Sequence, residues 1–489
     1  MGKNPRIRRH PILDFERGRR VRFQFEGQWL EGYENESIAA ALFASGVKIF
    51  GRSKRFNHPT GWFCGIGKCS SCLMRVNGIP NVRTCITPVR EGMRVAIQDR
   101  KGMLPDEPDI KVAKKEEHVQ VLIIGGGPAG LETEITSTRL GLNTLIIDEN
   151  PIPGGQLTKQ THKFFGSKKE YAGLRGFEIA GTMLEELRKC GGRYLTETSA
   201  IGYSGKDGKH KFLAVQKREG DYQLLEIKAD NIVVTSGASE NYLPFPGNYL
   251  PGVYGAGGVQ TLMNVYGVKP GNKALVVGTG NVGLIIGYQL LQAGVEVKAL
   301  IETMPCVGGY LVHASKLVRL GVPILLRHTI KEAKGEQYVN GATIIAVDKN
   351  KQPIEGTELE LDVDLILIAV GLSASTRIIS QAGCEKMFVS ELGDWISIHN
   401  ANMETTIDGI YVAGDGSGIA EASTAMLEGR IAGAAIAEKE SYNPEEAQRI
   451  KEEAFSELSK LKESSFLKAV TAGKRRCQQK WDEVKSREK

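Results

Sequence analysis

The sequence predicts an α/β protein with two Rossmann-like dinucleotide-binding domains, one inserted in the other, preceded by a small β-grasp ferredoxin-like domain. Three observations lead to this prediction. A G-x-G-x-x-G turn follows the apolar run 121–124, and a second such turn follows the apolar run 273–277. Four of the eight cysteines are clustered near the N-terminus. A late apolar strand ends in Gly414-Asp415 and completes the first nucleotide-binding domain.

Length and composition describe an ordinary globular protein of several domains. A chain of 489 residues is too long for one hydrophobic core. The net charge of +6 is small and the charges are interspersed, so no nucleic-acid partner is expected. The longest apolar segment, 274–291, is interrupted by glycines and an asparagine, which argues against a transmembrane segment. The basic N-terminus has no apolar stretch behind it, so we expect no secretory signal and a reducing, cytoplasmic location.

Residues 1–98 are predicted to form the β-grasp domain. Apolar and polar residues alternate over 20–33, which indicates a β-hairpin. An alanine-rich helix follows, with Ser37 as its N-cap. The next segment, 99–118, is rich in Pro, Lys and Glu without periodicity and is predicted to be a linker.

The cysteine cluster has the spacing C-x4-C-x2-C followed by a more distant fourth cysteine. This is the plant-type [2Fe-2S] ligand pattern. Glycines between the first two cysteines let the backbone approach a cluster, so that its N–H groups can donate hydrogen bonds to sulfur. The predicted ligands are Cys64, Cys69, Cys72 and Cys85.

Three other roles fit the four cysteines less well. A structural zinc site usually combines two C-x-x-C pairs, and only Cys69 and Cys72 form one. Disulfides need an oxidising compartment, which the sequence does not indicate. A catalytic thiol does not need three further cysteines. The other cysteines are scattered and are interpreted as packing or surface thiols: Cys190, Cys306, Cys384 and Cys477.

The first glycine-rich turn predicts an FAD-binding domain formed by 119–267 and 391–440. Its three glycines allow a tight turn, the approach of a pyrophosphate and the close packing of the next helix, whose N-terminal N–H groups face the phosphates. The strand that follows ends in an acid suited to a ribose hydroxyl. A purely structural turn is the alternative. The predicted cofactor-binding residues are Gly125, Gly127, Pro128, Ala129, Gly130, Asp148, Glu149, Gly155, Gln156 and Gly237.

The late strand delivers Gly414 and Asp415 to the start of a helix whose first residues are small. A carboxylate there can accept hydrogen bonds from a ribityl chain, and the helix N-terminus can stabilise negative charge on a reduced flavin. An aspartate that only caps the helix is the alternative. We therefore add both residues to the predicted FAD site.

The second glycine-rich turn predicts an inserted domain, 268–390, with Gly278, Gly280 and Gly283 in the same order. Its acid, Glu302, stands one residue later than in the first copy. No arginine stands near it in the sequence to bind a 2′-phosphate, so NAD(H) is favoured over NADP(H). The repeat implies either two nucleotide sites or one site and a relic.

The last segment, 441–489, is charged, is helical in pattern and becomes basic towards its end. We interpret it as a helical tail that is solvated or contacts another protein chain.

Residues 119–440 resemble flavoproteins with two dinucleotide-binding domains, in which an NAD domain is inserted into a split FAD domain. The residues that carry the resemblance are the two glycine-rich turns and the pair Gly414-Asp415. Disulfide reductases of this type have a C-x-x-C or C-x4-C pair beside the flavin. No such pair occurs outside the N-terminal cluster, so dithiol chemistry is not expected.

The whole chain more closely resembles the α subunits of heteromeric amine and imino-acid dehydrogenases, including the sarcosine oxidase, opine oxidase, hydrogen cyanide synthase and dye-linked L-proline dehydrogenase types. The similar stretches are 20–33, 51–61, 148–156 and 243–247. The resemblance implies a hetero-oligomer in which the amine is oxidised on the FAD of a separate β-type subunit. It also implies an FMN between subunits, small ferredoxin-like subunits and membrane association through partners.

The resulting hypothesis is an electron-transferring flavin and iron–sulfur subunit of an amino- or imino-acid dehydrogenase of the proline, hydroxyproline, sarcosine or opine type. One alternative is a stand-alone NADH:acceptor reductase. The other is a non-redox scaffold subunit whose nucleotide sites are structural. The sequence indicates no substrate pocket with a general base, and no catalytic residue is assigned.

Overall fold

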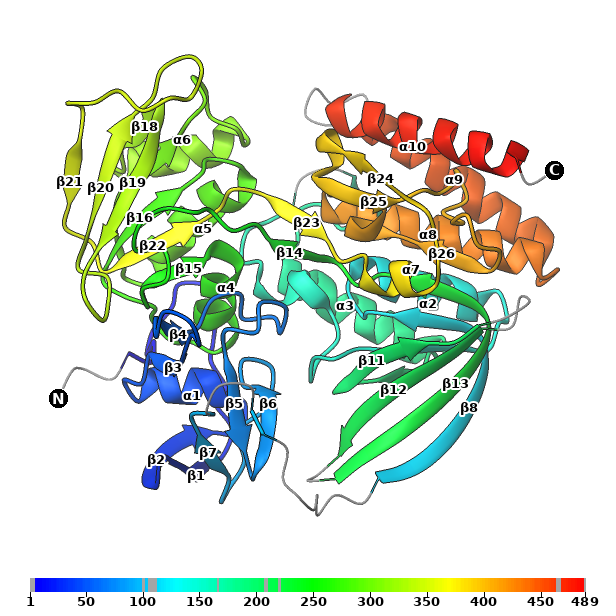
Figure 1. Cartoon of the computed structure of the whole chain (residues 1–489). Helices are drawn as coiled ribbons and strands as arrows, with labels where there is room; N and C mark the ends of the chain where they lie inside the picture. Colours follow the sequence, from blue (N-terminus) through cyan, green and yellow to red (C-terminus); the bar gives the residue numbers. More distant parts are fainter. Residues whose placement is uncertain are drawn as a thin grey trace. The chain divides into compact units, whose positions relative to one another are not determined.

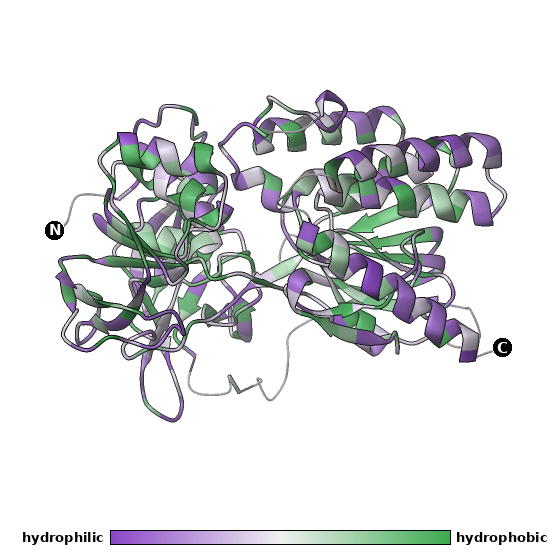
Figure 2. Ribbon diagram, turned by 90° about the horizontal axis from the view of Figure 1, so that it is seen from above, coloured by the Kyte–Doolittle hydropathy of each residue, from purple (hydrophilic) through white to green (hydrophobic). Residues whose placement is uncertain are grey.

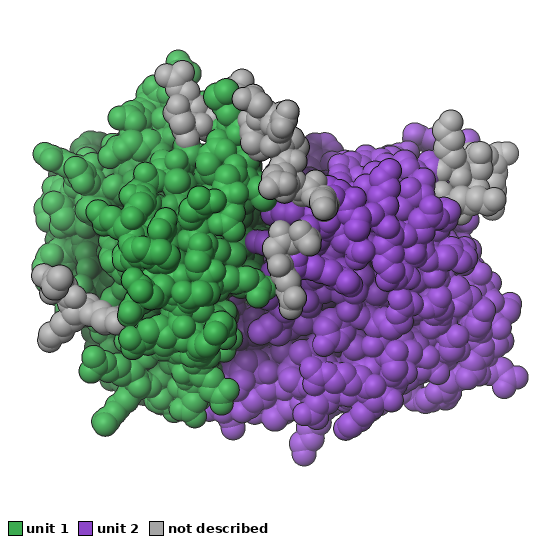
Figure 3. Space-filling model, turned by 90° about the horizontal axis from the view of Figure 1, so that it is seen from below, with its two compact units in different colours: residues 1–108, 240–371 green, residues 109–239, 372–489 purple. Residues whose placement is uncertain are grey.

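The computed structural model describes residues 5–98, 102–103, 112–164, 167–205, 210–218, 221–462 and 468–487. The chain divides into two compact units, each made of two segments (Figure 3). Unit 1 comprises Met1–Pro108 and Glu240–Gly371, and unit 2 comprises Asp109–Ser239 and Leu372–Lys489. The α/β fold with two nucleotide-binding domains and an N-terminal domain is confirmed.

The N-terminal part of unit 1 is a five-stranded sheet that packs against one short helix. The predicted hairpin is formed by β1 and β2, and β7 pairs with β1 in parallel. Helix α1 (Ile38–Ala44) is buried along its whole length, and the Ser37 hydroxyl caps it by accepting a hydrogen bond from Ala40 N. The strands in sheet order are β2 (Gln28–Tyr33), β1 (Arg20–Phe25), β7 (Arg94–Ala96), β5 (Leu73–Val76) and β6 (Ile79–Arg83), and a separate pair is β3 (Ile49–Arg52) and β4 (Pro59–Gly61).

The second part of unit 1 contains a five-stranded parallel sheet. The segment between the strands β18 (Ile324–Leu326) and β22 (Leu365–Ile368) forms a separate three-stranded antiparallel sheet. The central strands of the parallel sheet are apolar and fully buried because helices and the smaller sheet cover them. In sheet order the parallel strands are β15 (Val253–Gly255), β22 (Leu365–Ile368), β16 (Lys273–Val277), β17 (Glu296–Glu302) and β18 (Ile324–Leu326). The other elements are α4 (Ala256–Gln260), the π-helical turn η3 (Thr261–Val265), α5 (Asn281–Gln292), α6 (Leu311–Arg319), β19 (His328–Lys334), β20 (Gly341–Ala346) and β21 (Leu359–Leu361).

Unit 2 is organised around a larger mixed sheet. Strand β8 begins at Val112, inside the segment predicted to be a linker, and pairs in parallel with β13 along most of its length. The strands in sheet order are β10 (Tyr194–Leu195), β9 (Thr144–Ile147), β8 (Val112–Ile124), β13 (Asp221–Val234), β12 (His210–Arg218) and β11 (Thr198–Tyr203), with β26 (Ile410–Val412) paired to β13. The helices are α2 (Pro128–Arg139), α3 (Gly176–Lys189), α7 (Arg377–Gln381), α8 (Ala422–Lys439), α9 (Pro444–Lys462) and α10 (Lys468–Arg487).

Short elements complete unit 2 and its connections. The chain leaves through β14 (Ala238–Glu240) and returns through β23 (Leu372–Ala374), and these two strands pair with each other. The small hairpin of β24 (Lys386–Val389) and β25 (Asp394–Ser397) follows. The 3₁₀ turns are η1 (Gly155–Lys159), η2 (Lys168–Glu170), η4 (Ser390–Leu392) and η5 (Gly414–Ser417).

The C-terminal segment is helical, but it is not simply solvated. Helix α9 buries Ala447, Ala454 and Leu458 in the main core of unit 2, and α10 buries Lys474 and Cys477 (Figure 1). In Figure 2 the strands are mostly hydrophobic, whereas hydrophobic and hydrophilic residues alternate along the helices, as expected for amphipathic helices that cover sheets. Within the described residues, no helix is both long enough and apolar enough to cross a membrane.

Candidate iron–sulfur and nucleotide sites

The four predicted ligand cysteines are brought together in unit 1 by loops of the β-grasp domain. Cys64 and Cys69 follow β4, Cys72 directly precedes β5, and Cys85 follows β6. Cys64, Cys72 and Cys85 are buried, and Cys69 is half-buried. Hydrogen bonds from the Cys69 and Cys85 thiols lower the pKa of Cys64, and the Cys85 thiol likewise lowers the pKa of Cys72. The four sulfurs therefore form one contiguous group.

Backbone donors also reach these sulfurs. Cys64 accepts from the N–H of Ile66, and Cys72 accepts from the Cys85 N–H. The Thr84 hydroxyl donates to the carbonyl oxygen of Cys72 at 2.7 Å. N–H donors to sulfur stabilise the thiolate charge of a bound cluster. Gly65 has a φ of +62°, and a Cβ there would come within 2.8 Å of the Trp62 ring, so the loop needs glycine at this position.

The arrangement suits a binuclear cluster better than a single ion. In the described part of the chain, no three His, Cys, Asp or Glu side chains are grouped so as to hold one metal ion. The four thiols are instead linked by hydrogen bonds in the order Cys69, Cys64, Cys85 and Cys72. Two cysteines for each of two irons is the ligation of a [2Fe-2S] centre, so the residues fit that group.

The cluster loop rests on α4 and η3 of the same unit. The Trp62 indole donates a hydrogen bond to Gly258 O at 3.0 Å, and the Tyr266 hydroxyl donates to Cys85 O at 3.3 Å. A Cβ on Gly258 would lie 1.9 Å from the carbonyl oxygen of Phe63, so the two backbones are in direct contact. This contact fixes the loop from outside the β-grasp domain, and the cysteine spacing gave no signal of it.

The first glycine-rich turn, in unit 2, has the geometry of a phosphate-binding site. Gly125 has a φ of +113°, and a Cβ on it would lie 2.5 Å from Thr235 O. A Cβ on Gly130 would lie 1.9 Å from Gly125 O, so packing alone requires this glycine. At Gly127, in contrast, no other described residue lies within 4 Å of an added Cβ. The middle glycine is therefore left open, as a pyrophosphate approaching the N-terminus of α2 requires.

Two further predicted residues are held against this turn. Asp148 accepts hydrogen bonds from Gly126 N at 2.6 Å and from Asn150 N at 2.7 Å, and burial raises its pKa. A Cβ on Gly155 would lie 2.8 Å from the Cα of Gly127, so the 151–156 loop closes over the turn. The expected acid and glycine loop thus lie at one site.

The late glycine-aspartate pair reaches the same site. A Cβ on Gly414 would lie 3.1 Å from the Ala129 Cβ at the start of α2, and one on Gly237 would lie 4.0 Å from Asp415 Oδ2. Burial raises the pKa of Asp415 to about 6, and the nearby Glu428 carboxylate adds to the increase. Ionised above that pH, Asp415 can accept hydrogen bonds from sugar-type hydroxyls.

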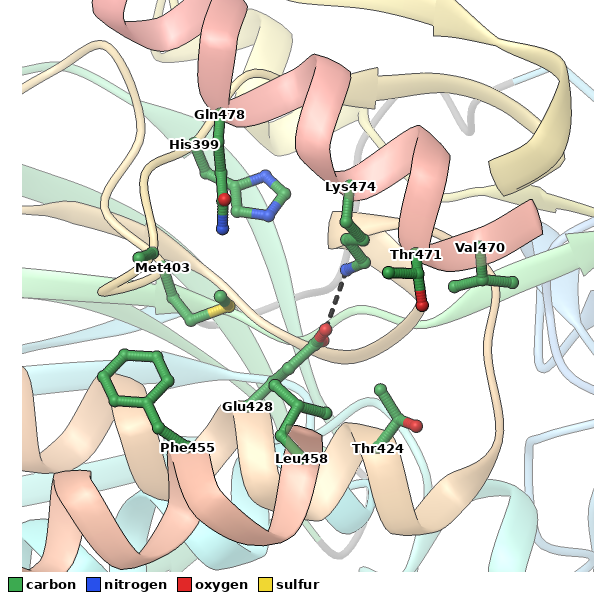
Figure 4. A pocket seen from close by; sticks show the side chains of 11 residues that line it. His399, Met403, Thr424, Glu428, Phe455, Leu458, Val470, Thr471, Lys474 and Gln478 are labelled. Atoms are coloured by element: carbon green, nitrogen blue, oxygen red, sulfur yellow. Dashed lines mark hydrogen bonds and ion pairs between the residues drawn. The ribbon is translucent and has the colours of Figure 1, made fainter. Parts of the chain in front are cut away.

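A buried ion pair beneath this turn was missed by the sequence analysis. Glu428 of α8 accepts hydrogen bonds from Gly414 N at 3.0 Å and from the Ser417 hydroxyl at 2.7 Å. Lys474 of α10 donates to Glu428 at 2.7 Å (Figure 4). It also donates to Ser417 Oγ at 2.6 Å. A single lysine in a charge-rich helical tail gives no sequence signal of such a role.

The second glycine-rich turn, in unit 1, repeats the first closely. A Cβ on Gly278 would lie 2.3 Å from Ala369 O, and one on Gly283 would lie 2.1 Å from Gly278 O. Gly280, like the middle glycine of the first copy, has no other described residue within 4 Å of an added Cβ. Glu302 accepts from Thr279 N at 3.0 Å and from its hydroxyl at 2.9 Å.

The one-residue shift of Glu302 has a structural cause. Strand β17 pairs with β16 with a register break, so that Ala274 faces Val297 and Leu275 faces Ala299. The extra residue between them is accommodated as a β-bulge, and the acid still ends beside the turn. The shift therefore does not move the acid away from its turn.

Two neighbours of the second turn were not predicted. Gly309 N donates to Thr279 O at 2.9 Å, and Gly308 N donates to the Thr279 hydroxyl at 3.2 Å, so a Gly-Gly loop covers this turn as 154–155 covers the first. The sequence signal was a Gly-Gly pair at the same distance after each acid. Arg327 N donates to Met304 O at 3.2 Å, which brings an arginine beside the loop although it is distant in sequence.

The fold and these sites define a redox protein of the flavin and pyridine-nucleotide class with an appended iron–sulfur domain. Residues 119–429 match the family described as pyridine nucleotide-disulphide oxidoreductase, and residues 18–100 match the family described as 2Fe-2S iron-sulfur cluster binding domain. The chain belongs to the pyridine nucleotide-disulphide oxidoreductase family, which implies FAD and NAD binding, and its N-terminal domain implies a 2Fe-2S cluster.

Relatives in sequence are subunits of opine oxidase, sarcosine oxidase and hydrogen cyanide synthase. The chain is 28% identical over 331 residues to an opine oxidase subunit from Agrobacterium tumefaciens (strain Ach5), covering 64% of each chain. It is 27% identical over 361 residues to the alpha subunit of sarcosine oxidase from Rhizobium meliloti (strain 1021), covering 61% of this chain and 36% of the relative. It thus spans less than two thirds of the length of both relatives. These similarities confirm the resemblance inferred from the sequence.

Solved structures confirm the fold. L-proline dehydrogenase from P. horikoshii superposes with a TM-score of 0.67 at 24% identity, over 91% of this chain and 79% of that one. Thioredoxin reductase from T. acidophilum superposes with a TM-score of 0.55 at 19% identity, over 66% of this chain and 99% of that one.

Proposed function

We propose that this chain is the electron-transferring subunit of a multi-subunit amino- or imino-acid dehydrogenase. The observation that carries the proposal is the contiguous group of four cysteine thiols in the same chain as a flavin-type nucleotide turn. The similarity to opine oxidase and sarcosine oxidase subunits supports the choice of an amine or imino acid as the ultimate electron donor.

The iron–sulfur site is assigned to Cys64, Cys69, Cys72 and Cys85. Their role is to supply four thiolates, while the N–H groups of Ile66 and Cys85 stabilise the negative charge on sulfur. When bound, the cluster exchanges single electrons and the flavin exchanges one or two, which suits a relay between a donor and an acceptor of different electron number.

The FAD site is assigned to the first turn and the residues gathered around it. The open backbone at Gly127 and the N–H groups at the start of α2 face the pyrophosphate. In this assignment Asp148 accepts a hydrogen bond from a ribose hydroxyl, and Asp415 accepts one from a hydroxyl of the ribityl chain. Pro128, Ala129, Glu149, Gln156 and Gly237 remain predicted neighbours of the cofactor.

The second turn is assigned to NAD(H). The backbone at Gly280 is open to a pyrophosphate, as at Gly127. Glu302, which bonds the turn, would accept a hydrogen bond from a ribose hydroxyl and would repel a 2′-phosphate. The exposed Arg327 near Met304 is a feature that would favour a 2′-phosphate, so the preference between NADH and NADPH is a direct test of this assignment.

The amine itself is assigned to a partner. We propose that proline, hydroxyproline, sarcosine or an opine is oxidised on a β-type FAD subunit, in a cytoplasmic hetero-oligomer that reaches the membrane only through partners. Small ferredoxin-like subunits and an FMN between subunits complete the proposed assembly.

A second candidate function is a stand-alone NADH:acceptor reductase. It is favoured by the complete second turn, because a relic would have no need to keep Gly280 open and Glu302 bonded to the turn. A scaffold with structural nucleotide sites is the third candidate. The three differ in what reduces the chain.

The test is an anaerobic titration of the purified chain, alone and with its β-type partner, monitored by visible absorbance. We expect proline or a related amine to bleach the flavin and cluster bands only when the partner is present. Bleaching by NADH without the partner, and by no amine with it, would transfer the assignment to the reductase. A colourless chain that still forms the complex would establish the scaffold.

A further inference from the structure

The ion pair between Lys474 and Glu428 is buried within unit 2. Glu428 is 3% exposed and Lys474 is 6% exposed. The pair connects the C-terminal helix α10 to the turn η5. Lys474 donates to Oε1 of Glu428, and Oε2 of Glu428 accepts from the Gly414 N–H. The Ser417 hydroxyl contacts both charged groups. A buried charge is stable only while its partner remains, so the conformation of η5 depends on Lys474.

The lysine lies outside the part of the chain that defines the family. The family match ends at residue 429, whereas Lys474 belongs to α10 (Lys468–Arg487). Helix α10 is anchored independently by other contacts: the Trp481 indole donates to Thr405 O at 3.1 Å, and Cys477 packs with Val389 and Leu392. Lys474 is therefore not needed to hold the helix in place.

A small cavity opens beside the ion pair (Figure 4). It offers about 30 Å³ to the centres of water molecules and is lined by His399, Thr424 and Thr471 as well as by both charged residues. The His399 Nε2 atom and the hydroxyls of Thr424 and Thr471 have no hydrogen-bond partner among the described residues. A cavity of this volume has room for about two waters, so the unpartnered polar groups beside the ion pair can be hydrated.

We propose that Lys474 is a positioning residue for the flavin site: by holding the Glu428 side chain beneath Gly414, it keeps the turn that carries Asp415 in its cofactor-binding conformation. The inference rests on the proposed FAD site and extends it to the C-terminal helix. Asp415 is two residues before Ser417, which Lys474 contacts directly. The C-terminal helix is then part of the flavin-binding apparatus and not a solvated tail.

The experiment measures FAD affinity of the full chain after removal of bound flavin, for the wild type and four variants. Lys474→Met removes the ammonium and keeps an unbranched apolar chain. Lys474→Arg restores a cation, and the double variant Lys474→Met/Glu428→Gln removes both charges while the new amide oxygen still accepts from Gly414 N. Lys480→Met is the matched control, because Lys480 lies on the same helix in an exposed pair with Glu483.

We expect Lys474→Met to raise the Kd for FAD about tenfold or more, since a lone buried carboxylate is strongly destabilising. Lys474→Arg and the double variant should recover most of the affinity, and Lys480→Met should match the wild type. Iron content, set by unit 1, should be equal in all five proteins. This rescue pattern separates positioning from a general loss of structure, which the charge-free double variant would not repair.

Equal FAD affinity in the wild type and in Lys474→Met would overturn the inference while leaving the proposed function intact. Weak binding in Lys474→Met with no rescue by either second variant would also overturn it, in favour of a packing role. A wild-type chain that binds no FAD would overturn both the inference and the FAD site on which it rests.

Discussion

Asp148 accepts a hydrogen bond from the backbone N–H of Gly126, the residue between the first two glycines of its turn, at 2.6 Å. Glu302 makes the equivalent bond to Thr279 in the second copy, at 3.0 Å. Each acid therefore fixes its own turn before any nucleotide is present. The two turns have the same local geometry, and this equivalence makes the pair of sites testable with matched substitutions.

The first prediction concerns Gly127 and Gly130. Gly127→Ala should fold with an unchanged melting temperature, because the residue is extended and its Cβ would meet no other described residue within 4 Å, yet the methyl group should block the pyrophosphate and abolish FAD binding. Gly130→Ala should lower stability by about 1–3 kcal/mol or more, because its Cβ would collide with Gly125 O. Thermal unfolding and flavin content measure both effects. Normal FAD content in a well-folded Gly127→Ala would argue against the assigned site.

The second prediction applies the same logic to the other copy. Gly280→Ala should lose NADH binding while FAD and iron contents remain at wild-type values, because the turn lies in a different unit from the FAD site. Fluorescence titration with NADH measures it. Retained NADH binding in this variant would mean that the second turn is a relic.

The third prediction concerns nucleotide preference at the second turn. Glu302 should repel a 2′-phosphate, so the wild type should bind NADH more tightly than NADPH, and Glu302→Gln should reduce that preference. The same titration carried out with both nucleotides gives the ratio. Tighter binding of NADPH by the wild type, lost in Arg327→Ala, would show instead that the neighbouring arginine decides the preference.

The fourth prediction concerns pH and Glu134, a buried residue of α2. Burial raises its pKa to about 7 from an ordinary value of 4.5. Since the folded state holds the proton more tightly, the contribution of this group to stability is complete below about pH 4.5 and is lost as the pH rises towards 7. The loss is at most about 3 kcal/mol.

Glu134→Gln should remove this pH dependence. The unfolding free energy of the variant minus that of the wild type should therefore increase between pH 5 and pH 8. Urea unfolding at the two pH values measures it. Glu116→Gln, at a side chain that is 71% exposed, is the control and should show no such change. A constant difference between Glu134→Gln and the wild type across this range would contradict the assigned pKa.

Residue spacing was enough to predict those features whose residues lie close together in the sequence. The two glycine-rich turns, the acids that follow them and the four cysteines are each defined within a short stretch, because a phosphate or a cluster needs its ligands at fixed separations. The pair Gly414-Asp415 was also predictable, because a strand running into a helix N-terminus at that point in the order can only complete the first domain.

Other features depend on contacts between distant segments and left little or no sequence signal. Lys474 is one cation among many in a charged tail, and only the packed structure shows that it is buried against Glu428. The support of the cluster loop by Gly258 joins segments far apart in the chain. The β-bulge in β17 explains the shifted acid only once the strand register is known. The Gly-Gly pair at 308–309 did carry a signal, as a repeat of 154–155.

The most direct test of the central claim is the metal, sulfide and flavin content of the purified full chain. The account predicts about two irons, about two sulfides and one FAD per chain, with iron lost in Cys72→Ser and retained in Cys190→Ser. A chain that contains zinc in place of iron, or that binds FAD with no iron under anaerobic purification, would contradict the assignment of an electron-transferring iron–sulfur flavoprotein.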